Sequence, residues 1–284
     1  MKQKMADRLA TLLLWGAGLA ILGILAWFLL YILMQGMPQI TWQFVSTKPS
    51  DIMAGGGVAQ PLFNSFYILM LSMLFSVPVS IGAGIYLAEY APNNLFTNMV
   101  RLSTESLATV PSIVLGLFGM IIFVNMFGFG FSIIGGAATL MLLNIPVLVR
   151  VTEEALKAVP ASFREASYAV GATKWQTIWR AVLPVATPGI ITGITLVAGR
   201  ALGETAILIF TAGTSVSRRI PDFDLFAAGE TLAVHMWYVN GIGLVPDKMQ
   251  IAAGCGALLI ISILIFNLIL AIPSRLMSKR MLGG

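Results

Sequence analysis

Long apolar stretches alternate with short polar connections along the chain. Six stretches come close to the roughly 20 residues that a helix needs to cross the hydrocarbon core of a bilayer. They cover residues 10–34, 62–87, 107–127, 132–149, 185–211 and 251–272. The pattern therefore predicts an all-α, polytopic membrane protein with six transmembrane helices.

The first apolar stretch follows a short basic start, as it does in a secretory signal peptide. A cleaved signal has an apolar region of about 7–15 residues, whereas residues 10–34 form a much longer one. We therefore expect it to remain as an anchor behind a cytoplasmic tail of residues 1–9. No composition shift divides residues 10–284, which are expected to form a single membrane domain with a cytoplasmic loop at about 150–184.

Basic residues are distributed unequally between the two sides that six crossings would create. Lys48, Arg218, Arg219 and Lys248 fall on one side, and twelve basic residues fall on the side of the termini. Because Lys and Arg are enriched in cytoplasmic segments, both termini are predicted to face the cytoplasm. The twelve are Lys2, Lys4, Arg8, Arg101, Arg150, Lys157, Arg164, Lys174, Arg180, Arg275, Lys279 and Arg280.

Composition excludes several classes of function. Hydrophobic residues make up 58% of the chain and charged residues 10%, which a water-soluble surface cannot accommodate. The net charge of +5 is explained by basic residues at the ends of spans, so nucleic-acid binding is not expected. Cys255 and His235 are the only residues of their types, which argues against a metal centre. His235 is expected to be an ordinary loop side chain.

The polar loop between the fourth and fifth stretches has helix signals. Ser162 with Glu165 fits a capping box, and Thr173 with Gln176 fits a second one. Gly171 suits the left-handed residue that ends a helix. The loop therefore predicts a helix, a turn and a second helix. From local physics alone, an amphipathic helix lying at the membrane surface and anchored by its aromatic residues is the competing interpretation.

The same loop resembles the EAA loop of permeases from binding-protein-dependent ABC importers. Glu165, Ala166, Gly171, Leu183 and Pro184 match its order and spacing, while Ser167 replaces its third alanine and Ala181 its usual isoleucine. In that family the loop is a coupling helix that docks into an ATPase subunit. The resemblance therefore implies that the ATPase-coupling residues are Phe163, Glu165, Ala166, Ser167 and Gly171.

Residues 110–119 and 183–213 narrow the resemblance to the phosphate-specific permeases of this family, with residues 205–213 closer to one of the two subunit types. The resemblance implies the architecture of a type I ABC importer permease in a bacterial inner membrane. It also implies three partners, which are a homologous permease, a dimeric cytoplasmic ATPase and an external phosphate-binding protein.

Arg200 and Glu204 are four residues apart within the fifth stretch, on one face of a continuous helix. Arginine at a helix centre costs roughly 2.5–3.5 kcal/mol on insertion scales, so the pair should face a partner or an aqueous cavity. In one interpretation the two charges merely neutralise each other. In the other, Arg200 offers its guanidinium fork to a passing oxyanion while Glu204 holds it in place.

Arg101 and Glu105 repeat this spacing near the inner end of the third stretch. They are either a cytoplasmic gate pair or simply the solvated start of a helix. Prolines lie in or next to the spans, where they kink helices for structural reasons or for gating. They are Pro78, Pro111, Pro146 and Pro188.

The sequence has no G-x-x-x-x-G-K-[ST] phosphate loop, so ATP and Mg²⁺ are expected on a separate ATPase chain, and no cofactor is expected on this one. No nucleophile and base set suggests an enzyme. A permease for another oxyanion such as sulfate, and an ion-coupled secondary transporter, remain alternatives. A weaker hypothesis assigns contact with the binding protein to loop residues Asp222, Phe223, Asp224 and Trp237.

Overall fold

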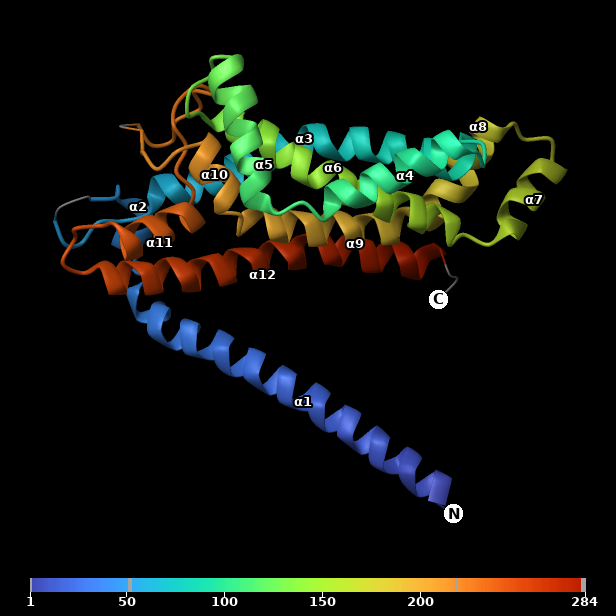
Figure 1. Cartoon of the computed structure of the whole chain (residues 1–284), viewed down its shortest axis with the longest axis horizontal. Helices are drawn as coiled ribbons and strands as arrows, with labels where there is room; N and C mark the ends of the chain where they lie inside the picture. Colours follow the sequence, from blue (N-terminus) through green and yellow to red (C-terminus); the bar gives the residue numbers. More distant parts are fainter. Residues whose placement is uncertain (1, 51–52, 218, 282–284) are drawn as a thin grey trace.

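The computed structural model describes residues 2–50, 53–217 and 219–281. The predictions above also include a few residues outside the described ones. Met1 belongs to the predicted cytoplasmic tail, residues 51–52 and Arg218 to the predicted external connections, and residues 282–284 to the end of the predicted membrane domain. Most helices run along one long axis, with α7 and α8 at one end and α2 and α11 at the other (Figure 1). The elements are α1 (Lys2–Gly36), η1 (Met37–Gln39), α2 (Trp42–Ser46), α3 (Ala59–Ile85), η2 (Tyr86–Tyr90), α4 (Leu95–Ala108), α5 (Ser112–Gly119), η3 (Met120–Met126), α6 (Ile133–Lys157), α7 (Ala161–Ala169), α8 (Lys174–Thr177), η4 (Ile178–Val182), α9 (Leu183–Leu202), α10 (Ala206–Thr211), α11 (Leu232–Gly241) and α12 (Lys248–Met281).

Five helical segments of the described chain are long and apolar enough to cross a membrane, and the bent pair α4–α5 makes a sixth if it counts as one span. This confirms the predicted all-α membrane architecture. Four of the six predicted stretches coincide with a continuous helix, and another, residues 185–211, does so only as far as Leu202. The third stretch, residues 107–127, does not form one continuous helix.

The third span breaks at Pro111. The axes of α4 and of α5 with its π-helical extension η3 meet at 98°. Pro111 has no N–H to donate, and its ring disfavours helical backbone at the residue before it, so α4 ends at Ala108 and α5 starts at Ser112. Because α4 is amphipathic and polar, a hydropathy criterion placed the start of this span too late.

The fifth span breaks as well, at Gly203. Helix α9 ends at Leu202, and helix α10 starts only at Ala206. Glycine weakens a helix, and the Glu204 carboxylate accepts a 3.5 Å hydrogen bond from the backbone N–H of Ile207 at the start of α10. The prediction of one uninterrupted helix over residues 185–211 is therefore wrong.

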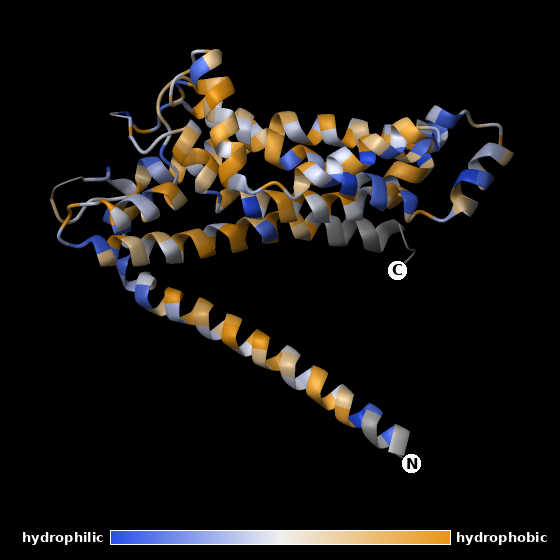
Figure 2. Ribbon diagram, viewed as in Figure 1, coloured by the Kyte–Doolittle hydropathy of each residue, from blue (hydrophilic) through white to orange (hydrophobic). Residues whose placement is uncertain are grey.

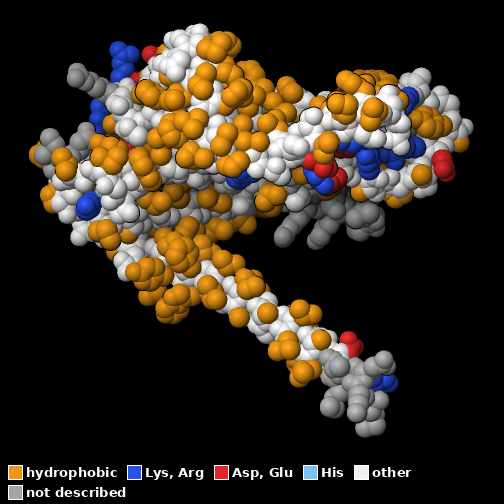
Figure 3. Space-filling model, in the orientation of Figure 1, with side chains coloured by type: hydrophobic (Ala, Val, Ile, Leu, Met, Phe, Trp, Pro, Cys, Tyr) orange, Lys and Arg blue, Asp and Glu red, His pale blue; other side chains and the backbone are white. Residues whose placement is uncertain are grey.

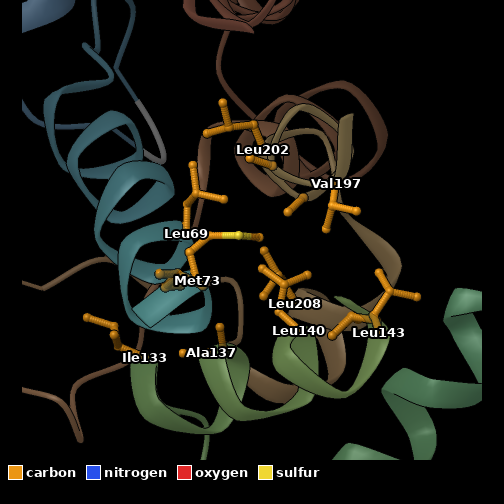
Figure 4. Close-up of a cluster of buried hydrophobic side chains, with 14 of the residues drawn as sticks. Leu69, Met73, Ile133, Ala137, Leu140, Leu143, Val197, Leu202 and Leu208 are labelled. Carbon is orange, nitrogen blue, oxygen red and sulfur yellow. The ribbon is translucent and has the colours of Figure 1, made fainter. Parts of the chain in front are cut away.

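The core lies where α3, α6, α9 and α10 meet (Figure 4). Leu69, Leu140, Val197 and Leu208 point toward one another there and are almost completely buried. Lipid tails are as apolar as these side chains, so tight packing rather than the hydrophobic effect holds such helices together. Small residues provide that fit at the contact between α3 and α6.

Helix α1 diverges from the rest of the bundle (Figure 1). Its apolar window is 0% buried, and apolar residues cover it along most of its length (Figure 2). It approaches α12 closely only at its end, where a Cβ on Gly36 would come within 2.1 Å of the carbonyl oxygen of Ala253. The packed core thus lies between four helices, and α1 does not pack against them along most of its length.

Two neighbouring glycines of α3 provide a matched test of this packing. A Cβ on Gly84 would lie 2.6 Å from Cβ and Cγ2 of Thr152 in α6, whereas a Cβ on Gly82 would meet nothing within 4 Å. Both changes to alanine raise helix propensity equally. We expect Gly84→Ala to lower stability by about 1–3 kcal/mol through overpacking. Gly82→Ala should leave the thermal midpoint in detergent unchanged or higher, and equal midpoints for both variants would contradict the close contact.

Candidate functional site

The loop that follows α6 forms the predicted helix, turn and helix. Gly171 has φ +82°, in the left-handed region, and its N–H donates to the carbonyl of Tyr168 at 2.9 Å. The predicted capping box at Thr173 and Gln176 is confirmed, with N–H to side-chain distances of 2.9 and 3.3 Å. The predicted box at Ser162 is wrong. Pro160 already occupies the N-cap, so Ser162 lies inside α7 and caps nothing.

Helix α7 protrudes beyond the bundle at the end opposite α2 and α11 (Figure 1). None of its residues is buried, and Phe163 and Tyr168 are each 44% exposed. Glu165 and Ala166 are exposed, whereas Ser167 is half-buried and its hydroxyl lies 2.9 Å from that of Thr177. The loop therefore presents an aromatic, acidic and small-residue surface that this chain leaves uncovered.

Arg200 and Glu204 do not form the predicted ion pair. Arg200 lies in the last turn of α9 and is exposed, while Glu204 lies beyond the helix end and is buried. In the described part of the chain the two side chains form no salt bridge with each other, because the break at Gly203 removes the helical geometry that would have stacked them. The Glu204 carboxylate instead accepts the long, 3.5 Å hydrogen bond from the N–H of Ile207 in the first turn of α10.

Arg200 is one of the residues that line a cavity of about 660 Å³ between α9 and α12. The hydroxyls of Thr192 and Thr195 donate to backbone carbonyls of their own helix at 2.9 and 2.8 Å, as expected for threonine in a membrane helix. Asn267, an amide within an otherwise apolar span, also faces the cavity and was missed by the sequence analysis, although its polarity there was the signal. The described lining residues are Ile191, Thr192, Thr195, Leu196, Gly199, Arg200, Ile263, Asn267 and Ala271, so Arg200 is the one ionisable group among them.

Arg101 and Glu105 each contact α6 instead of each other. Arg101 Nε lies 2.8 Å from Glu153 Oε1, and Glu105 Oε1 lies 2.9 Å from Nη1 of Arg150. Basic and acidic side chains gather here on the α7 side of the molecule (Figure 3). Glu153 also binds Lys157, at 2.6 Å. The two residues thus tie α4 to α6 at the end of the bundle that carries α7, and whether they gate a path stays a prediction.

At the opposite end, His235 is not a loop side chain as predicted. It lies within α11, is 4% exposed, and its Nδ1 is 3.1 Å from Oε2 of Glu230. Asn64 of α3 donates to the backbone carbonyl of Glu230 at 3.0 Å, and Ser65 accepts from the N–H of Leu232 at 2.8 Å. These buried bonds fasten the start of α11, and Glu230 two residues before it, to α3. The sequence gave no signal of this arrangement, because a single histidine forms no pattern from which its partner could be predicted.

The four external residues considered for binding-protein contact have different environments. Asp222 is buried, and hydrogen bonds from the Ser217 hydroxyl and the Asp224 N–H hold the pKa of its carboxyl below the usual value. Asp222 therefore orders its own loop. Phe223 and Trp237 remain exposed, at 63% and 44%.

Comparison with known proteins shows to which family the chain belongs. A family described as "Binding-protein-dependent transport system inner membrane component" matches residues 80–283, which include the whole cytoplasmic loop and both helix breaks. The chain belongs to this family. Members are inner-membrane components of transport systems, and not catalytic enzymes.

Relatives in the family cover most of the chain. The chain is 45% identical over 278 residues to "Probable ABC transporter permease protein YqgI" of Bacillus subtilis, covering 94% of this chain and 95% of that protein. It is 34% identical over 245 residues to "Phosphate transport system permease protein PstA" of Mycobacterium leprae, covering 84% and 80%. A PstA of Yersinia pestis is 40% identical over 169 residues, covering 60% and 57%.

Solved structures confirm the fold of a type I ABC importer permease. A chain of the inward-facing MetNI methionine ABC transporter superposes with a TM-score of 0.64 at 19% identity, covering 78% of this chain and 95% of that one. A chain of the bacterial alginate ABC transporter, in complex with its alginate pentasaccharide-bound periplasmic protein, gives 0.65 at 16% identity, covering 93% and 96%. At these identities the likeness concerns the fold alone.

Labelling of introduced thiols tests the orientation of this family member in the membrane. Glu165→Cys should react with a membrane-impermeant maleimide in inside-out vesicles and stay unlabelled in intact cells, because α7 is exposed and predicted to be cytoplasmic. Cys255 is an internal control, since it is buried and should not react from either side. Labelling of the α7 thiol in intact cells would reverse the predicted topology.

Proposed function

We propose that this chain is the PstA-type permease subunit of an ATP-driven importer and forms the path for inorganic phosphate across the bacterial inner membrane. The observation that carries the proposal is the uncovered helix–turn–helix at the end of the bundle, with Glu165, Ala166 and Gly171 placed as a docking surface. A secondary transporter has no use for such a surface. The coupling residues are Phe163, Glu165, Ala166, Ser167 and Gly171.

Three partners complete the proposed importer. Since the sequence has no phosphate loop, a PstB-like ATPase dimer binds ATP and Mg²⁺ and docks on α7. A PstC-like homologous permease supplies the other half of the path, and a PstS-like external protein delivers phosphate. The family description, which names dependence on a binding protein, supports the last of these.

Phosphate is proposed as the substrate because of relatives and because of Arg200. Relatives named phosphate transport system permeases are 34–40% identical to this chain. A guanidinium matches oxyanions with two parallel N–H donors, and Arg200 is exposed in a membrane cavity where no other ionisable side chain is among the described lining residues. Glu204 supports this site indirectly, since its carboxylate accepts a hydrogen bond from the first turn of α10, next to the break beside Arg200.

In the proposed mechanism, the two helix breaks allow the membrane helices to move. Breaks at residues 109–111 and 203–205 precede α5 and α10, which pack together where a Cβ on Gly116 would lie 3.0 Å from Cα of Ile207. When the ATPase subunits close, they push on α7, the long helices tilt, and the breaks allow access to Arg200 to alternate between the two sides.

A permease for another oxyanion, such as sulfate, remains the nearest alternative. Relatives differ in what their names say, since YqgI carries no substrate name. The amount of ATP hydrolysed by the purified importer in the presence of phosphate, arsenate or sulfate, each presented on the binding protein, separates these alternatives. An ion-coupled secondary transporter would accumulate substrate when ATP is replaced by an analogue that cannot be hydrolysed.

Arg200→Ala tests the proposed anion contact. Loss of the one cation in the cavity should reduce phosphate uptake by more than about tenfold, equivalent to about 1.4 kcal/mol of transition-state stabilisation, while the complex still assembles. Arg200→Lys should restore uptake only in part, because an ammonium cannot donate as a fork. Thr192→Val is the matched control, since that hydroxyl lines the same cavity but bonds its own helix. Normal uptake by Arg200→Ala would remove Arg200 from the path.

Gly171→Pro tests the docking loop. Proline requires φ near −65° and has no N–H, whereas Gly171 has φ +82° and donates to Tyr168. We expect ATP hydrolysis to continue while phosphate uptake per ATP falls by about tenfold or more. Gly171→Asn is the control, because asparagine tolerates the left-handed conformation. Undisturbed coupling in the proline variant would show that this turn has no role in coupling.

A further inference from the structure

Helix α7 must be fastened to the bundle by something other than burial. None of its residues is buried, so a push on its outer surface would simply bend the loop unless a stiff contact connects it to the membrane helices. Its neighbour α8 continues directly into η4 and α9, but α7 itself has no such continuation. The polar contacts of α7 therefore decide whether it transmits force.

Arg164 makes nearly all of those contacts. Its Nη2 and Nε lie 2.6 and 3.2 Å from the same carboxylate oxygen, Oε1 of Glu89, and Nε is 3.5 Å from Oε2. Its Nη1 donates to the carbonyl of Val159 and its Nη2 to that of Leu156, both at 2.9 Å. Leu156 lies in the last turn of α6 and Val159 just beyond its C-cap Ala158, where the helix dipole favours a cation. Arg164 thus joins α7 to two other elements at once.

Glu89 lies in η2, the π-helical turn that extends α3 toward the cytoplasm. Its side chain is only 8% exposed. The next residue, Tyr90, has the ammonium of Lys174 over its ring at 4.7 Å, and Lys174 begins α8. The segment η2 therefore contacts both helices of the cytoplasmic loop, one through Glu89 and the other through Tyr90. Turns of π-helix often occur at functional sites.

The contacts continue from η2 into α4. Nη2 of Arg101 donates to the backbone carbonyl of Leu87 at 3.0 Å, and Nε of the same side chain binds Glu153 of α6. Leu87 is buried, so its carbonyl cannot exchange this donor freely for water. Helix α4 in turn leads to the break at Pro111 and to α5. A chain of charge-assisted contacts thus runs from α7 through η2 to the helix that ends at the first break.

We infer that the Arg164–Glu89 ion pair is the joint that transmits movement of α7 to α3 and α4, which makes Glu89 a positioning residue for transport. This inference rests on the proposed function and adds to it the route by which docking reaches the membrane helices. This largely buried ion pair is suited to the task because two guanidinium nitrogens contact one carboxylate oxygen while the same side chain also binds two backbone carbonyls, so several contacts hold the joint in place, unlike a single exposed contact.

A double-mutant cycle tests the joint. Glu89→Gln, Arg164→Gln and the double variant are assembled with the partner permease, the ATPase and the binding protein in proteoliposomes, and inorganic phosphate uptake is measured per ATP hydrolysed. We expect each single variant to lose about fivefold or more, and the double variant to be no worse than the worse single one, because the two side chains act through one contact. Arg180→Gln is the matched control, since Arg180 is an exposed arginine of the same loop that forms no ion pair within the described part of the chain.

Co-purification of the ATPase with each variant separates transmission from a mere shaping of the docking surface. The inference requires normal co-purification and binding-protein-stimulated ATP hydrolysis alongside the reduced uptake. Unchanged uptake per ATP, strictly additive losses, or loss of the ATPase from the complex would each overturn it. Absence of ATP-driven phosphate uptake in the unaltered complex would instead refute the proposed function and the joint with it, whereas an active complex with unaffected variants refutes the joint alone.

Discussion

Every backbone N–H and C=O group at membrane depth must find a partner within the protein, because hydrocarbon offers none. A continuous helix meets this requirement by itself, and an interrupted helix does not. This chain interrupts two of its apolar spans, at residues 109–111 and 203–205. Exposed groups at the breaks, such as Thr109, Pro111 and Gly203, need either another protein surface or water. In the proposed importer, the breaks are therefore the places where the path or the second permease would adjoin this chain.

The placement of charge follows the same constraint. Ionisable side chains of α4 and of the C-terminal half of α6 are arranged as neutralising sets, in which Glu153 lies between Arg101 and Lys157 and Arg150 lies between two carboxylates. Arg200 differs from them, because it is exposed in a cavity beside a helix break without an acidic partner among the described residues. A compensated charge holds helices together, whereas an uncompensated one is available to an anion. The structural role of the neutralised side chains and the proposed anion-binding role of Arg200 follow from this difference.

Hydropathy and local motifs predicted much of the architecture. The four continuous spans, the turn at Gly171 and the capping box at Thr173 depend on residues close together in sequence, and each was correctly predicted. Contacts across helices were not predictable in this way. Arg101 binds a residue 52 positions away and Arg164 one 75 positions away, and no periodicity encodes such pairs. The Arg200–Glu204 pair failed because spacing of four implies contact only within an unbroken helix, and Gly203 ends it.

Contact between the cytoplasmic loop and an ATPase is the central claim, and site-specific cross-linking tests it most directly. Ala166 is exposed on α7, so a photoreactive side chain placed there should cross-link to the ATPase subunit in native membranes, with a yield that changes when a non-hydrolysable ATP analogue is added. A photoreactive group at Leu196, which is 69% exposed on α9, serves as the comparison within the membrane and should yield no ATPase adduct. Cross-linking of position 166 to lipid alone, with the ATPase present in the same membranes, would contradict the account.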